Sequence, residues 1–160
     1  MSQTIEAQLS KRRLSSVDEL HSQVLIDAFE YWRSKCGDKG LPSRPEIDPI
    51  EMKLFLDRIM LVDVESEPRR YRYRLVGTLI TQTTNRDVTS QYWDEVYTDI
   101  QYEVLKVSLD NVVETRKPCR STGSVNYVRK EFVSVEVLDL PLSADGINVD
   151  MILRVVDFSI

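Results

Sequence analysis

The sequence predicts an α+β domain built on one five-stranded antiparallel sheet. Two strand-like segments precede a long amphipathic helix, and three strand-like segments follow it. Pro118 ends that helix, because proline has no N–H for the helical ladder and clashes with the preceding turn. Strands on both sides of one helix predict a helical crossover and a single layer of helices on the sheet.

The composition is that of one globular domain. The chain has 160 residues, 42% of them hydrophobic, and a chain of this length buries about 70% of its unfolded surface. The net charge of −5 gives no general attraction to nucleic acid or anionic lipid. No apolar stretch approaches the roughly 20 residues of a membrane span. Cys36 and Cys119 form no CxxC motif, and we expect reduced thiols in a cytoplasmic protein.

The N-terminal part predicts a flanking helix before the sheet. Residues 1–15 are polar and weakly periodic, as in a flexible leader. Ser16 and Glu19 have the spacing of a capping box, and apolar residues then recur every three or four positions. Gly37 can end the helix in a left-handed conformation. We therefore expect a leader over 1–15, a helix over 16–37 and the main domain over 38–160.

The centre of the chain supplies two strands and two helices. A proline-containing capping signal at residues 48–51 predicts a short helix over 49–56. Residues 59–64 are almost all apolar, which is typical of a strand covered on both faces. Residues 70–76 alternate arginine with tyrosine or leucine, which predicts a second strand. Residues 99–117 return to a helical period.

Three strands complete the chain, over residues 119–128, 131–142 and 147–158. An Asp-Gly pair at residues 145–146 marks the second turn. The apolar residues of the middle strand change phase along its length, from Val133, Val135 and Val137 to Leu138, Leu140 and Leu142. A bulge, or cover on both faces, would explain the change.

Six motifs in order carry a family resemblance. They are Tyr31-Trp32-Arg33, Leu41-Pro42-Ser43-Arg44, Ile47-Asp48-Pro49, Tyr71 to Thr78, Arg86-Asp87-Val88-Thr89 and Leu140 to Gly146. Together they resemble the short stand-alone PAS proteins, mostly alphaproteobacterial, that form the fifth PAS profile family. The resemblance covers residues 31–156. It implies a PAS-like fold and a sensory or protein-interaction function, and it supplies no ligand.

The chain departs from the family at two glycines beside the fifth motif. Asn85 and Ser90 stand where the family usually has glycine. Asparagine tolerates a left-handed backbone, so we expect Asn85 to keep its turn, whereas serine leaves the turn at Ser90 less certain to form.

Enzyme and cofactor signatures are missing from the sequence. It contains no GxGxxG, GxxxxGK[ST], HExxH or GxSxG motif. Its single histidine, His21, lies on the predicted N-terminal helix, where a surface position is the expected role rather than haem or metal ligation. A flavin–cysteinyl photosensor needs a cysteine after the second strand, and residues 78–97 contain none. We therefore expect no cofactor, no metal and no chromophore.

The arginine-rich segment 69–74 resembles a nucleic-acid-binding strand. Alternation places Arg70, Arg72 and Arg74 on one face and the tyrosines on the other. A site that stacks bases needs aromatic and basic side chains on the same surface. We therefore expect a solvated strand face and no nucleic-acid partner.

A second charged feature is Glu136, which lies mid-strand between two valines. An unpaired carboxylate there would be costly, and the candidate partners are Arg74, Arg86 and Arg129. One interpretation is an internal salt bridge that fixes the sheet. The other is a ligand clamp inside the domain, which would bind an acidic or amide-bearing small molecule. The expected ligand-binding residues are Arg74, Arg86, Tyr73, Tyr127 and Glu136, while Asp87 and Thr89 would cap the small helix beside them.

The N-terminal helix has more apolar positions than one narrow stripe. They are Leu20, Val24, Leu25, Phe29 and Trp32. These side chains can form a homodimer interface, or they can pack on the chain's own sheet. A two-fold contact needs only one self-complementary patch, so a homodimer is the expected assembly.

The favoured function is a non-enzymatic sensor or adaptor. A small molecule or partner would shift the population of helix positions, and an unidentified signalling protein would detect that shift. One alternative is a small α+β enzyme of the isomerase or dehydratase type, with Glu136 as base and Tyr73 or Tyr127 as phenol. Two strands before the long helix favour the sensor, because the isomerase fold begins with its helices. A further alternative is a structural oligomerisation module.

Overall fold

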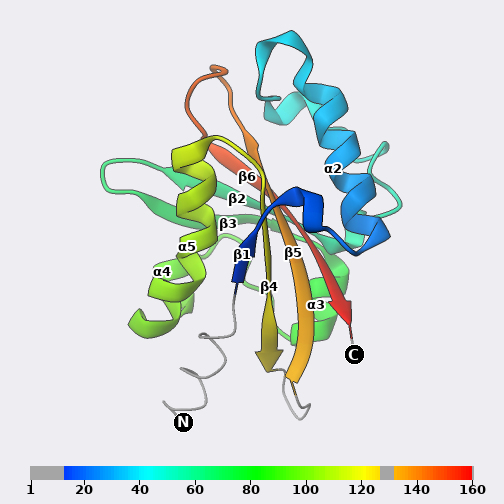
Figure 1. Ribbon diagram of the computed structural model, residues 1–160. Helices are drawn as coiled ribbons and strands as arrows, with labels where there is room; N and C mark the ends of the chain where they lie inside the picture. The colour runs from blue at the N-terminus through cyan, green and yellow to red at the C-terminus, as the bar shows by residue number, and fades with distance from the viewer. Residues whose placement is uncertain (1–12, 127–131, 160) are drawn as a thin grey trace.

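The computed structural model describes residues 13–126 and 132–159 and shows an α+β fold with one antiparallel sheet (Figure 1). The sheet has six strands in the order β1-β4-β5-β6-β2-β3. Their bounds are β1 (Arg13–Ser15), β2 (Ile59–Glu65), β3 (Arg70–Val76), β4 (Cys119–Asn126), β5 (Phe132–Leu142) and β6 (Met151–Ser159). Five of them are the predicted strands. The sixth, β1, falls in the expected leader and pairs with β4.

The helices are α2 (Gln23–Cys36), α3 (Thr78–Thr84), α4 (Trp93–Val96) and α5 (Asp99–Thr115). Short 3₁₀ turns flank them, at η1 (Val17–Glu19), η2 (Gly37–Lys39), η3 (Arg44–Glu46) and η4 (Leu56–Arg58). Helix α5 ends two residues before the predicted limit, because Arg116 adopts a left-handed conformation with φ of 59°.

The predicted helix over 16–37 is divided in two. The capping box at Ser16 forms, but it caps only η1. The backbone is extended at Leu20, and a second cap, Ser22, begins α2 by accepting a hydrogen bond from the Leu25 N–H at 3.3 Å. The Ser22 side chain bonds to the backbone and so starts a new helix at this point. The apolar residues keep their helical spacing across the break, and the spacing alone therefore did not reveal it.

The predicted short helix over 49–56 is wrong. This segment is a series of turns in which the Met52 N–H is shared between the Asp48 and Pro49 carbonyls, both at 3.2 Å. Phe55 then bonds back to Met52 at 2.9 Å, which is a three-residue step. The segment buries Met52 and Phe55 against the sheet. Tertiary packing has therefore overridden the local capping signal.

Helices cover both faces of the sheet, which corrects the prediction of a single helical layer. Helix α2 lies on one side, here called the outer face, and α5 and α4 lie on the other, the inner face (Figure 1). Strand β5 shows the consequence. Its register with β6 is continuous, and Val135 and Val137 pack on the inner face with Ile80 of α3. The phase change in this strand therefore reflects cover on both faces.

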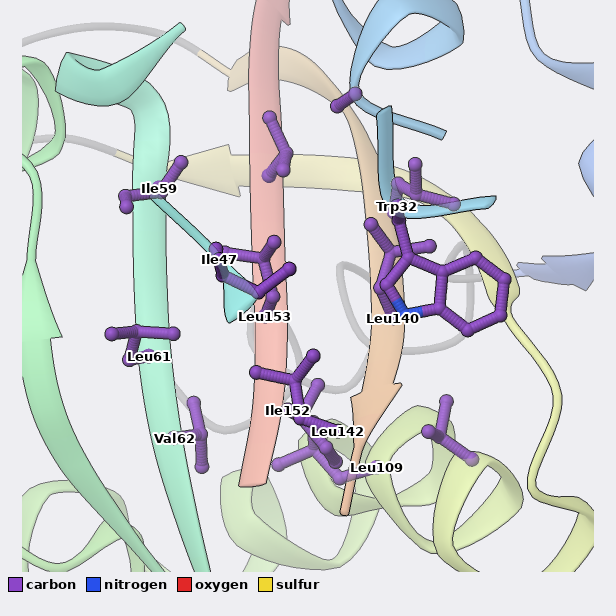
Figure 2. Close-up of a cluster of buried hydrophobic side chains, with 14 of the residues drawn as sticks. Trp32, Ile47, Ile59, Leu61, Val62, Leu109, Leu140, Leu142, Ile152 and Leu153 are labelled. Atoms are coloured by element: carbon purple, nitrogen blue, oxygen red, sulfur yellow. The ribbon is translucent and has the colours of Figure 1, made fainter. Parts of the chain in front are cut away.

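The outer-face core joins α2 to the centre of the sheet. Figure 2 shows Trp32 and Ile47 among side chains of β2, β5 and β6. The Trp32 indole N–H donates to the Pro141 carbonyl at 2.9 Å, so this large ring is buried with its polar atom satisfied. Leu25 and Ala28 are fully buried beside it. Fully burying one such apolar side chain contributes about 1.5–3 kcal/mol, which fixes α2 to the sheet.

Candidate functional site

A buried ion pair lies at the centre of the inner face. Asp139 of β5 and Arg154 of β6 are direct cross-strand partners. Arg154 donates from Nε to Asp139 Oδ1 at 2.7 Å and from Nη2 to Oδ2 at 3.0 Å. The same Nη2 donates to the Ser108 hydroxyl of α5 at 3.1 Å. Strand register therefore makes a bidentate pair, and the crossover helix adds a third contact.

An aromatic cluster packs against this pair. The guanidinium carbon of Arg154 lies 5.1 Å from the Trp93 ring centroid, within cation–π range. Tyr73 stacks on the same indole at 5.0 Å, and Tyr97 meets it edge-on at 5.6 Å. The two tyrosine hydroxyls lie 2.5 Å apart. We call Asp139, Arg154, Ser108, Trp93, Tyr73 and Tyr97 the inner-face cluster.

The indole nitrogen of Trp93 is an exception to the usual satisfaction of buried donors. Trp93 is only 1% exposed, and its Nε1 has no hydrogen-bond partner among the described residues. An unpaired buried donor costs about 1–3 kcal/mol, so such a group calls for an explanation. It marks this cluster as a place where an additional acceptor would be stabilising.

The electrostatics of the cluster favour a permanently charged Arg154. Burial alone lowers the pKa of this guanidinium, but the attraction and hydrogen bonds of Asp139 outweigh burial and the net pKa is raised. Nearby Tyr71 also has a raised pKa, because it is buried and donates its hydroxyl to Asp110 of α5. The inner face therefore holds a cationic Arg154 and a protonated Tyr71 phenol at neutral pH.

Comparison with known proteins identifies the family. A model of the PAS domain family matches residues 20–156. The chain belongs to the PAS domain family. A search of solved structures finds a similar fold in an RNA-binding light-oxygen-voltage receptor, with a TM-score of 0.55 at 8% sequence identity. The match covers 92% of this chain and 38% of the receptor chain, so the present chain spans well under half of that protein. No curated protein matches.

The PAS domain separates the sequence-predicted ligand residues between two faces. Tyr73 belongs to the inner-face cluster, whereas Glu136 lies on the outer face, where it pairs with Arg120 at 2.7 Å. The expected arginine partners are elsewhere: Arg74 is exposed and lies 3.8 Å from Asp63, and Arg86 is exposed. Arg120 was missed because it lies on the adjacent strand, and strand register is not visible in the sequence.

Two of the expected residues, Tyr127 and Arg129, lie outside the described residues. Asp87 and Thr89 do not cap a helix, which corrects that prediction. The Asp87 carboxylate accepts hydrogen bonds from the Thr89 amide at 3.0 Å and from its hydroxyl at 2.6 Å. Helix α4 begins later, after an N-cap at Tyr92. The pair therefore forms a local turn in the preceding loop.

The arginines of β3 and the preceding turn pair with carboxylates. Arg70 binds Asp94 at 2.7 Å and also covers the Tyr92 ring, with its guanidinium carbon 3.6 Å from the centroid. Arg69 lies 3.3 Å from Glu114 of α5. These contacts account for the basic pattern as local ion pairing along the strand and its neighbouring helices.

The predicted dimer residues are unequally placed. Leu25 is fully buried and Trp32 is 6% exposed, both against the chain's own sheet, which is the second of the two packing arrangements that the sequence left open. Leu20, Val24 and Phe29 are half-buried at the edge of the same core. These three side chains keep part of their surface exposed, and the homodimer stays a prediction.

Sequence reasoning missed the most deeply buried charges. Asp139 lies between Leu138 and Leu140, and Arg154 lies between Leu153 and Val155. A charged residue inside an apolar strand is the same signal that drew attention to Glu136, and it could have identified both. Trp93 carried no comparable signal, because a tryptophan in a polar segment predicts only an anchor to the core.

Among the residues that the structure describes, no group of histidine, cysteine, aspartate and glutamate side chains is placed to hold a metal ion. Within the same ranges, 13–126 and 132–159, no helix has the length and apolar character needed to cross a bilayer.

Proposed function

We propose that this PAS domain is a non-enzymatic sensory or regulatory module that binds a small molecule at the inner-face cluster and signals through a partner protein. The observation that carries the proposal is the buried Trp93 Nε1, a donor that finds no acceptor in residues 13–126 and 132–159 and lies beside a buried arginine and two tyrosine hydroxyls. Perturbed and unsatisfied polar groups concentrate at functional sites more than elsewhere in a core.

The charges of the cluster indicate the kind of ligand. Asp139 already neutralises Arg154, so a further anion would leave a buried negative charge without a counter-charge. A neutral ligand with a carbonyl or amide oxygen avoids that penalty, because its oxygen can accept from the indole N–H. The stacked faces of Trp93 and Tyr73 favour a planar molecule. Of the two expected ligand classes, the amide-bearing one therefore fits better.

The same geometry weakens the isomerase or dehydratase alternative. That reaction needs an acidic base and a phenol in one pocket. Glu136 lies on the outer face and accepts hydrogen bonds from Arg120 and two backbone amides, whereas Tyr73 lies on the inner face. This separation disfavours the Glu136–Tyr73 pair, while Tyr127, the other candidate phenol, lies outside the described residues. The two predicted strands, β2 and β3, also precede the long helix, as the sensor interpretation expects, together with the short β1.

The two tryptophans give a direct assay, because Trp93 lies on the inner face and Trp32 on the outer face. Protein purified from its own cells is first weighed by native mass spectrometry, and a retained neutral small molecule is expected. Emission is then recorded from Trp32→Phe, which reports Trp93, and from Trp93→Phe, which reports Trp32. Removing and restoring the retained molecule should shift only the Trp93 emission. A uniformly ligand-free mass, or a shift confined to Trp32, contradicts the proposal.

A further inference from the structure

The Glu136 carboxylate joins three separate parts of the chain on the outer face. Its Oε1 accepts from the Ser22 N–H at 2.7 Å, and its Oε2 accepts from the His21 N–H at 3.0 Å. Arg120 of β4 donates from Nε to the same Oε2 at 2.7 Å, and from Nη1 to the Ser15 hydroxyl of β1 at 2.8 Å. We call Glu136 and Arg120 the latch.

The latch lies at the start of α2, where a carboxylate is stabilised by the helix. His21 and Ser22 directly precede a 14-residue helix, and the amides at such a start have no intrahelical partner. A carboxylate there meets unsatisfied donors and the positive end of the helix dipole together. The side chains of Glu136 and Arg120 are 12% and 10% exposed, so solvent screens the pair little. Burial raises the Glu136 pKa, yet the amides and Arg120 leave that pKa lowered.

The segment that the latch holds contains no buried side chain, although Val17, Leu20 and Val24 pack half-buried at the edge of the core. None of residues 13–24 is buried, in contrast to Leu25 and Ala28 directly after them. Strand β1 contributes three register pairs at the edge of β4. The capping contacts of η1 are internal to the segment. Residues 13–24, here called the strap, are therefore attached to the domain by the latch, by the short β1–β4 pairing and by half-buried side chains only, and a segment with no buried side chain is the kind of unit that opens locally.

We infer that the strap is a releasable element and that the latch is its switch. When the Glu136 carboxylate loses its hold on the His21 and Ser22 amides, β1 and the start of α2 separate while the buried part of α2 stays docked. Release uncovers the backbone edge of β4 at residues 120–122, which β1 otherwise occupies. An open strand edge leaves its backbone N–H and C=O groups unpaired, so the strap keeps these groups paired until it opens. This device operates whether or not a ligand binds the inner face.

Asp157 provides a matched control for Glu136. It is the direct cross-strand neighbour of Glu136 on β6 and also forms a carboxylate–arginine pair, with Arg58 at 2.8 Å. Its carboxylate accepts a hydrogen bond from Arg58 of η4, which lies outside the strap. Glu136→Gln and Asp157→Asn therefore remove the same kind of charge from adjacent positions, and only the first touches the latch.

Amide hydrogen exchange of the full chain tests the inference. In Glu136→Gln, exchange over residues 13–24 should become about tenfold to a hundredfold faster, the effect of losing one charge-assisted hydrogen bond. Exchange in β2, β5 and β6 should stay at the wild-type rate, and Asp157→Asn should leave the strap unchanged. Ser15→Ala, which spares the buried pair, should give a smaller acceleration in the same residues.

Two results would overturn the inference. One is equal acceleration of strap and sheet in Glu136→Gln, since that would make the latch a part of the global fold. The other is wild-type exchange that is as slow over residues 13–24 as in β5, because the strap would then open only with the whole domain. The second measurement needs no variant, so it decides the question even if Glu136→Gln does not fold.

Discussion

The Asp139–Arg154 pair allows a quantitative test of the inner-face cluster. The Asp139 side chain is fully buried and that of Arg154 is 6% exposed. Removing either partner leaves the other charge buried without compensation. Asp139→Val and Arg154→Met should therefore each lower the free energy of unfolding by about 3–5 kcal/mol. For a domain of this length one kcal/mol corresponds to about 2–4 °C, so Tm should fall by roughly 6–20 °C.

The double variant separates pairing from simple loss of packing. Replacing both residues removes a charge together with its counter-charge. The free energy of unfolding of Asp139→Val with Arg154→Met should therefore lie within about 2 kcal/mol of the wild-type value. Urea unfolding followed by far-UV circular dichroism gives both the free energy and the m-value. Two results would refute a dry, coupled pair. One is a loss in unfolding free energy below about 1 kcal/mol in the single variants, and the other is a loss in the double variant equal to the sum of the two single losses. A stable double variant also supplies a folded protein that should no longer retain the proposed ligand.

Four further predictions concern other parts of the chain. Gly77→Ala should lower the free energy of unfolding, measured by chemical denaturation, by at least about 1–3 kcal/mol, because an added Cβ would lie 2.4 Å from the Asp57 carbonyl oxygen. The lowered pKa of Glu136 stabilises the fold above the ordinary glutamate pKa of about 4.3. The stability difference between wild type and Glu136→Gln should therefore be constant at neutral pH and shrink as the pH falls through the lowered value. Equilibrium sedimentation at tens of micromolar should show a dimer, and a monomer there would mean that α2 packs only on its own domain. Purified protein should show no visible absorbance from haem or flavin, and stoichiometric absorbance would contradict the expectation of no chromophore.

The elements that the sequence predicted correctly depend on local chemistry. The apolar run at 59–64 and the alternation at 70–76 became β2 and β3, and Pro118 separates α5 from β4. Asn85 keeps its turn with φ of 55°, as expected. Ser90 also adopts a positive φ of 73°, although serine gives no local reason for it, because its N–H donates to the Tyr73 carbonyl at 2.6 Å. At Ser90 a tertiary hydrogen bond holds the positive φ that a glycine would have adopted without such help.

Local patterns in the sequence placed five of the six described strands and the long helix in the right order, and they supported the PAS resemblance, whereas β1 was missed. Hydrophobic period, proline and capping residues act over a few positions, so a linear pattern carries them. Which charged side chains meet depends instead on how distant strands pair. Asp139 meets Arg154 because strand register places the two directly opposite one another. Glu136 is opposite Thr122, and it reaches Arg120 diagonally, two residues further along the neighbouring strand β4. Register and face are set when distant strands pair and both sides of the sheet are covered, and no short-range pattern contains that information.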